Sequence, residues 1–404
     1  MRVAIYPGMA FANLGGSFTI TDEIVRALAA KIGQGTHEFI VLAPSKETAL
    51  RAACGDLQVV TLDETTVGRS TSARARRWAR RMAYRLSGYS STPNLAVERL
   101  LAANEIDVVW YPSAWECLTV EVPYITTVWD LQHRLQPCFP EVSRNRAWDN
   151  RERMFSAALR RASLVIAGTQ AGQEEIERFY DVPRERIRLL PHPTPQFLDK
   201  VEPARPDLPD LKGDFIFYPA QFWPHKNHFA LIEALHLLRQ RDGLPISLVL
   251  TGSDMGNLPF LRAMIERRGL SSAVRVLGFV SREQLVWLYR HALALTYVTY
   301  FGPENLPPLE AFAAGCPVIA SDVSGAREQL GDAAFLVNPR RPEQIADAVK
   351  TLHFDLNLRN QLVERGTIRA KRFTADDFVD GVVKWLDEFE PVRRCWPSGG
   401  LPVR

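Results

Sequence analysis

The feature that most constrains the fold is a regular alternation of short apolar runs with longer helical segments, which occurs twice along the chain. Such nearly continuous runs, rich in Val and Ile, are typical of strands buried on both faces of a parallel sheet. Between them, Ile20, Ile24, Leu28 and Ile32 recur every four residues and share one helix face. The sequence therefore predicts two α/β, Rossmann-like, doubly wound sheets. The predicted strands span 2–6, 38–43, 57–62, 107–112, 124–129 and 163–168, then 215–220, 246–252, 274–280, 292–298, 317–322 and 333–338.

A proline-rich stretch separates the two halves. Residues 191–214 contain six prolines, and proline cannot donate to a strand ladder and ends helices. We expect an N-terminal domain over 1–195, a linker over 196–212 and a C-terminal domain over 213–374. The last helical segment, 375–390, is expected to return to the first domain. Because ligands of such sheets bind at the carboxyl ends of the strands, the cleft between the domains is the expected site.

Composition excludes several classes of protein. With 46% hydrophobic and 24% charged residues, the chain is neither disordered nor a fibre. The net charge of +3 gives no reason to expect nucleic acid. The five cysteines are scattered and form no Cys-x-x-Cys pair, which argues against a disulfide framework or a zinc ribbon. No apolar run reaches the roughly 18 residues of a membrane span. We expect a cytoplasmic protein, soluble or peripheral at the inner face of the membrane.

The richest motif lies in residues 299–331. Two prolines suit the first turn of a helix over 307–314, which ends before a glycine. The loop before it, 302–306, would present backbone N–H groups at a positive helix end, a ready anion site. Glu310, one turn into the helix, is placed to bind a diol such as a ribose.

These residues resemble the retaining glycosyltransferases of family four, which have the GT-B fold and include mannosyl-, fucosyl- and rhamnosyltransferases. The segment LPPLEAFAAGCPVIAS (306–321) closely matches the family pattern Leu-Pro-x-Leu-Glu-Ala followed by Ala-x-Gly-x-Pro-Val-Ile-Ala. The resemblance extends to 217–235, 251–257 and 276–285 and covers essentially the whole chain. It implies two Rossmann-like domains that face a cleft.

The resemblance also implies site residues. Lys226 falls on the lysine that contacts the donor diphosphate, where it would stabilise the charge that grows on the leaving phosphate. Glu310 falls on the residue that binds the donor ribose. A loop that approaches phosphate or acceptor is expected at Gly15, Gly16 and Ser17, although a plain turn is the alternative. Further donor-binding residues are expected at Gln221, Gly278, Phe279, Gly302, Asn305 and Leu306.

The chain departs from the family at three positions. The family has a second glutamate where this chain has Gly302, and Glu304 would take that role only through a changed loop. The arginine that precedes the lysine by five residues is replaced by Gln221. A His-Asp pair is replaced by Trp129-Asp130.

His133 lies three residues after this pair. Asp130 and His133 would line the cleft or serve as structural polar groups at a strand end. The candidate catalytic residues are Lys226, Glu304, Asp130 and His133.

Residues 69–85 contain seven arginines, and Trp78 and Met82 would share a helix face among them. A basic amphipathic helix is typical of a membrane-surface element, although a solvated arginine-rich helix is the alternative. The residues expected to contact a membrane surface are Arg74, Arg77, Trp78, Arg81 and Met82.

The resulting hypothesis is a retaining, metal-independent hexosyltransferase without a cofactor. It would move a hexose or deoxyhexose, with mannose from GDP-mannose as first choice, to a glycan or lipid-linked acceptor in surface polysaccharide or lipopolysaccharide synthesis. This donor is implied by the resemblance alone. The alternatives are a catalytically silent nucleotide- or glycan-binding subunit and a sugar-nucleotide epimerase.

Overall fold

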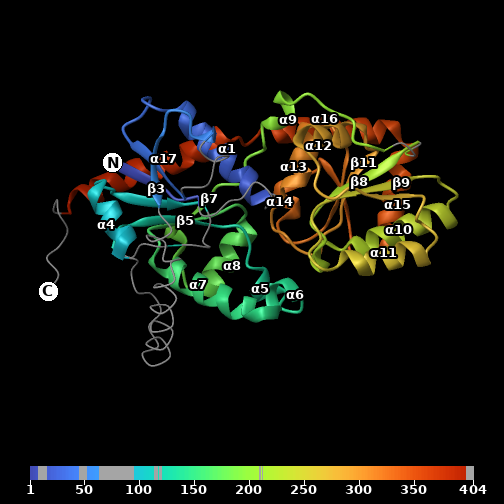
Figure 1. Ribbon diagram of the computed structural model, residues 1–404, viewed down its shortest axis with the longest axis horizontal. Coiled ribbons are helices and arrows are strands. Elements are labelled where there is room, and N and C mark those ends of the chain that lie inside the picture. The colour runs from blue at the N-terminus through green and yellow to red at the C-terminus, as the bar shows by residue number, and fades with distance from the viewer. Residues whose placement is uncertain are drawn as a thin grey trace.

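The computed structural model describes residues 1–7, 16–44, 52–62, 95–112, 117, 121–208, 211 and 213–396. Two parallel sheets, each flanked by helices, lie side by side (Figure 1). Within these residues one sheet has seven strands in the order β3-β2-β1-β4-β5-β6-β7, and the other has six in the order β10-β9-β8-β11-β12-β13. Neighbouring strands pair in parallel. The predicted pair of doubly wound sheets is confirmed.

The strands of the first sheet are β1 (Arg2–Ile5), β2 (Glu38–Pro44), β3 (Gln58–Leu62), β4 (Val108–Tyr111), β5 (Tyr124–Val128), β6 (Leu164–Ala167) and β7 (Ile187–Leu189). Those of the second are β8 (Phe215–Pro219), β9 (Ser247–Thr251), β10 (Val274–Val276), β11 (Ala294–Tyr297), β12 (Val318–Ser321) and β13 (Ala334–Val337). Twelve of the thirteen strands coincide with apolar runs that the sequence predicts as strands. Strand β7 does not coincide with a predicted run, because it has three residues and two of them are exposed.

The helices of the first half are α1 (Gly16–Ala30), α4 (Leu95–Ala103), α5 (Gln132–Leu135), α6 (Pro140–Ser143), α7 (Ala147–Arg161) and α8 (Gln170–Tyr180). The expected linker contains α9 (Phe197–Lys200). The second half has α10 (His228–Gln240), α11 (Leu258–Arg267), α12 (Arg282–His291), α13 (Leu306–Ala313), α14 (Ala326–Leu330), α15 (Pro342–Phe354), α16 (Leu356–Ala370) and α17 (Ala375–Arg394). The 3-10 turns η3 (Arg144–Arg146) and η4 (Arg184–Arg186) belong to the first half, and η5 (Pro224–Lys226) belongs to the second.

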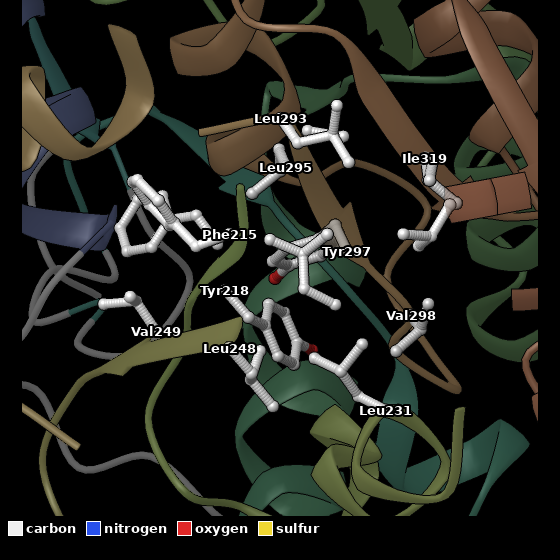
Figure 2. Packing of buried hydrophobic residues seen from close by; sticks show 14 of the residues in the cluster. Phe215, Tyr218, Leu231, Leu248, Val249, Leu293, Leu295, Tyr297, Val298 and Ile319 are labelled. Atoms are coloured by element: carbon white, nitrogen blue, oxygen red, sulfur yellow. The ribbon is translucent and has the colours of Figure 1, made fainter. Parts of the chain in front are cut away.

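The second sheet is held by a continuous apolar core. Figure 2 shows Phe215, Tyr218, Leu248 and Tyr297 in this core, with side chains from neighbouring strands in contact. The rings of Tyr218 and Tyr297 meet edge to face at 5.2 Å, an arrangement that aromatic pairs favour. Protein interiors are close-packed. The core therefore holds the carboxyl ends of β8 and β11 in fixed positions at one edge of the second sheet.

Helix α17 completes the first domain. It lies beside α1 (Figure 1), and its Phe378 is fully buried and stacks on Trp110 of β4 with 6.2 Å between ring centres. Thr374 and Asp377 form a capping box at its start, which satisfies backbone donors of the first turn. The end of the chain therefore contributes to the core formed by its beginning. No helix among the described residues is long and apolar enough to cross a bilayer.

Candidate active site between the two domains

A cavity of about 640 Å³ opens between the two domains. The second domain contributes loops that follow β11, β12 and β13, and the first domain contributes residues of α5 and α8 with the residue after α5. Its position at the carboxyl ends of parallel strands is the one expected of a ligand site. The lining residues are Leu135, Gln136, Glu175, Tyr300, Phe301, Gly302, Asp322, Val323, Ser324, Leu336, Val337, Asn338, Pro339, Arg340 and Gln344.

Lys226 ends η5, the turn that follows β8. Its Nζ donates a 2.9 Å hydrogen bond to the hydroxyl of Tyr297, and the hydroxyl of Tyr218 donates a 2.6 Å bond to the Lys226 carbonyl. Both tyrosines belong to the apolar core. The ammonium group is thus held at the edge of the sheet, and a lysine has three N–H donors, so two remain for a ligand.

Glu310 lies on α13 and is buried. Its Oε2 accepts a 2.6 Å hydrogen bond from the hydroxyl of Tyr289. Burial raises the pKa of the Glu310 carboxyl, and the bond from Tyr289 opposes this effect. One of its two oxygens is therefore engaged by α12.

Glu304 is directed into the junction of the two domains. Its Oε1 accepts a 2.8 Å hydrogen bond from the backbone N–H of His192, and its carboxylate lies directly over Gly168, where a Cβ atom would overlap it. Burial raises the pKa of Glu304 to about 8, and the charge of Glu328 acts in the same direction. The structure thus gives Glu304 a contact between domains.

The loop before α13 has a conformation that disfavours the family's second glutamate. Gly302 has φ +139°, and a Cβ atom there would lie 2.6 Å from the amide of Asn305. That amide donates a 2.9 Å bond to the Gly302 carbonyl, and Gln329 bonds both the N–H and the carbonyl of Asn305 at 2.9 Å. Leu306 packs into the core of the first domain. This loop conformation therefore favours glycine at position 302.

Asp130 and His133 lie in different surroundings. Asp130 is one-third exposed and its Oδ1 accepts bonds from the backbone N–H of Gln132 at 2.9 Å and from Arg151 at 3.5 Å. The His133 side chain has no exposed surface, and its Nε2 lies 3.0 Å from the hydroxyl of Tyr180. Burial lowers the pKa of His133 to about 4. The structure therefore gives His133 the environment of a neutral core residue.

The other expected donor-binding residues lie at the ends of β8 and β10. The Gln221 Oε1 accepts a 2.9 Å bond from the indole of Trp223. Gly278 has φ +69°, and its carbonyl accepts a 2.8 Å bond from the N–H of Gly252. Phe279 is 66% exposed, so an apolar ring projects from this edge.

Two expectations fall wholly or partly outside the described residues. Gly15 is not among them, whereas Gly16 and Ser17 begin α1. The arginine-rich segment, with Arg74, Arg77, Trp78, Arg81 and Met82, also lies outside them. Among the residues that are described, no group of three or more His, Cys, Asp or Glu is arranged to hold a metal ion.

Three contacts that join the domains have no local signal in the sequence. Glu328 of α14 accepts bonds from the first backbone N–H groups of α8, at Gln170 (2.7 Å) and Ala171 (3.2 Å). Asp22 of α1 pairs with Arg282 of α12 at 3.2 Å. The carboxylate of Glu141 accepts hydrogen bonds from the backbone N–H and the ring of His225, the residue before Lys226. These partners are far apart in the sequence, and nothing local signals them.

Comparison with known proteins assigns both halves to glycosyltransferases. Residues 14–195 match the family described as Glycosyltransferase Family 4, and residues 202–369 match Glycosyl transferases group 1. The chain is 27% identical to O-antigen chain mannosyltransferase B of Escherichia coli, over 55% of this chain and 60% of that protein. It is also 27% identical to alpha-D-kanosaminyltransferase of Streptomyces kanamyceticus, over 51% of this chain and 55% of that one. The chain thus spans less than two thirds of the length of these curated relatives.

Solved structures share the fold over nearly the whole chain. HepE of Anabaena, in complex with UDP and glucose, aligns with a TM-score of 0.70 at 18% identity and covers 96% of this chain and 100% of that one. Sucrose-phosphate synthase of Thermosynechococcus elongatus aligns with a TM-score of 0.72 at 16% identity, over 97% of this chain and 100% of that one. The predicted architecture of two Rossmann-like domains facing each other is confirmed.

Proposed function

Because this chain belongs to the group 1 glycosyltransferases of the GT-B fold, we propose that it transfers a hexose or deoxyhexose from a nucleotide sugar to a glycan. GDP-mannose is the proposed donor, since two relatives are named O-antigen chain mannosyltransferases. By the same comparison, the proposed acceptor is a growing surface polysaccharide, free or lipid-linked. The observation that carries the proposal is the placement of Lys226 at the carboxyl edge of the second sheet.

The reaction separates a sugar from a nucleoside diphosphate, so negative charge grows on the leaving phosphate. The Lys226 ammonium would stabilise this charge, because a positioned cation lowers the barrier most where charge develops. The N-terminus of α13 offers an anion its positive helix end and the backbone N–H of Leu306. Pro307 and Pro308 carry no N–H, and the N–H of Asn305 is bonded to Gln329. These two features give the leaving group a positive environment from the protein itself. We therefore propose a reaction that needs no metal ion and, as the family resemblance implies, retains the anomeric configuration.

Glu310 is the proposed ribose ligand. Its bond from Tyr289 holds the carboxyl in one orientation, and a carboxylate can accept hydrogen bonds at both oxygens. Attachment to a membrane surface is proposed only through the basic segment 69–85, which would carry a lipid-linked acceptor to the cleft.

The first experiment compares thermal stabilisation by GDP, UDP, dTDP and ADP. A ligand at 100 times its dissociation constant adds roughly 2.7 kcal/mol to the unfolding free energy of the domain that it binds. We expect one nucleotide to stabilise the wild type and to have a much smaller effect on Lys226→Ala and Glu310→Gln. Lys371→Ala, which removes an exposed lysine, is the matched control.

The second experiment supplies the matching nucleotide sugar and measures transfer to saccharide acceptors. Turnover by the wild type and its loss in Lys226→Ala would support the proposal. Gly302 and the engagement of Glu304 at the domain junction favour one other candidate, a silent nucleotide-binding subunit. Nucleotide stabilisation without turnover by the wild type would favour that alternative.

A further inference from the structure

Glu141 of α6 joins the first domain to η5, the turn of the second domain that carries Lys226. Helix α6 lies at the end of the first domain that faces the second (Figure 1). The Oε1 atom of Glu141 accepts a 3.1 Å hydrogen bond from the backbone N–H of His225 and a second bond from Nδ1 of its ring. Burial alone would raise the pKa of Glu141, but the bonds from His225 hold it below its ordinary value. The carboxylate is therefore ionised at neutral pH, and both bonds are charge-assisted.

The second domain holds the carbonyl side of the same turn. The carbonyl of His225 accepts a 2.8 Å bond from the N–H of Tyr300 and a 3.2 Å bond from the hydroxyl of Thr299. Within the described part of the chain, the backbone N–H of His225 has Glu141 as its hydrogen-bond partner. The residue before Lys226 is thus bonded through its carbonyl to its own domain, and through its N–H and its ring to the other domain.

The first domain fixes the segment that carries Glu141. Four residues separate α5 from α6, and Arg134 of α5 forms an ion pair with Glu152 of α7. The Arg134 guanidinium also lies over three aromatic rings, which attract a cation. The rings belong to Trp148, Phe179 and Tyr180, with 5.6, 5.7 and 5.6 Å from the guanidinium carbon to their centres. Because α5 is anchored in this way, Glu141 approaches His225 from a support that belongs to the first domain.

This contact is a poor choice for stability alone. The Glu141 side chain is 6% exposed, and its second oxygen, Oε2, is buried without a hydrogen-bond partner among the described residues. A buried acceptor that is left unpaired costs free energy. Replacement of a buried ion pair by well-packed apolar residues is often neutral or stabilising. A carboxylate at this point of the junction therefore indicates a function in the placement of η5.

We propose that Glu141 is a positioning residue for Lys226, an inference that rests on the proposed function. By holding His225, the Glu141 carboxylate fixes η5 and with it the point from which the Lys226 side chain extends toward the leaving diphosphate. Lysine has a long, flexible stem, so the placement of its ammonium depends on the backbone that carries it and on the 2.9 Å bond from Nζ to the Tyr297 hydroxyl. Because Glu141 belongs to the first domain, full affinity for a nucleoside diphosphate requires the contact between the domains.

The first test measures, by isothermal titration calorimetry, the dissociation constant of the nucleoside diphosphate that stabilises the wild type. We expect Glu141→Ala to raise this constant about tenfold, because Lys226 then occupies its place for less of the time. Glu141→Gln keeps an oxygen that accepts the bond from the His225 N–H, so it should restore most of the affinity. Glu185→Gln, at an exposed position of η4 in the same domain, is the matched control and should bind like the wild type.

A double-mutant cycle separates positioning from a merely structural role. In a Lys226→Ala background, Glu141→Ala should change the dissociation constant less than about twofold, since its effect passes through Lys226. An equal loss of affinity in both backgrounds, or an unchanged constant in Glu141→Ala alone, would overturn the inference while the proposed function stands.

Hydrogen exchange of the ligand-free protein tests the same contact without a nucleotide. In Glu141→Ala, the peptide that covers residues 222–228 should lose protection, because the His225 N–H no longer has its acceptor. Strand β9 should exchange as in the wild type, which shows that the fold is kept. Unchanged protection of the peptide would overturn the inference. Loss of protection in Glu141→Ala, together with a wild type that binds no nucleotide, would contradict the proposed function instead.

Discussion

The carboxylate of Glu304 accepts a hydrogen bond from the backbone N–H of His192, with 2.8 Å between Oε1 and N. A loop of the second domain is therefore bonded to the segment that leaves the first. Both ring nitrogens of His192 are buried without a hydrogen-bond partner among the described residues, and burial lowers the pKa of this histidine to about 3. The Glu304 carboxyl is thus buried beside a neutral histidine at the junction, and its protonation should influence how firmly the domains are joined.

Stability should fall as pH rises from 7 to 9, in part because of Glu304. Its pKa is about 8 in the folded protein and near 4.5 when unfolded, so the folded state holds the extra proton and loses it as pH rises. The fall should level off above about pH 9. Glu304→Gln keeps an oxygen for His192 and removes the titration, so its thermal midpoint should fall less over this interval. Equal slopes for the two proteins would refute this assignment. The buried histidines titrate below this interval and do not interfere.

Gly168→Ala should destabilise the protein by about 1–3 kcal/mol, because the new methyl group would overlap the Glu304 carboxylate. Gly35→Ala is the control, since a Cβ atom there would meet nothing within 4 Å. A double-mutant cycle with Glu304→Ala measures the coupling. We expect the added methyl group to cost less once the carboxylate is gone. Strict additivity would show that the two residues do not interact.

Gly302→Glu, which restores the family's glutamate, should lower activity. A side chain at this position must adopt φ +139° and displace the amide of Asn305, a strain of about 1–3 kcal/mol. Transfer rate and thermal midpoint should both decrease relative to wild type. A gain in rate with an unchanged midpoint would mean that the loop accepts the glutamate.

Glu328→Ala should weaken the contact between the domains. Its carboxylate caps α8 from the other domain, and carboxylates at helix N-termini contribute roughly 0.5–2 kcal/mol. We expect a wider distribution of dimensions in X-ray scattering and a lower thermal midpoint. Glu343→Ala, at an exposed position of α15, is the control. Equal behaviour of the two variants would assign no role to the cap.

Local patterns account for most of the fold that could be predicted. Apolar runs longer than four residues revealed their strands, and the two prolines before Leu309 placed α13 to within one residue at each end. The positions of Lys226 and Glu310 came from motif order. Side-chain direction could not be read in this way: Glu304 and His133 are buried in contacts with partners distant in the sequence.

The packing of α17 has a consequence for biosynthesis. The core of the first domain contains Phe378, Val382 and Leu386, so a ribosome must translate past residue 386 before this core can close. The core cluster of the second domain ends at Ala370, so all of its residues are translated before α17. During translation the domain made first is thus the last to be completed, and chains halted before residue 375 would expose the apolar surface that α17 covers.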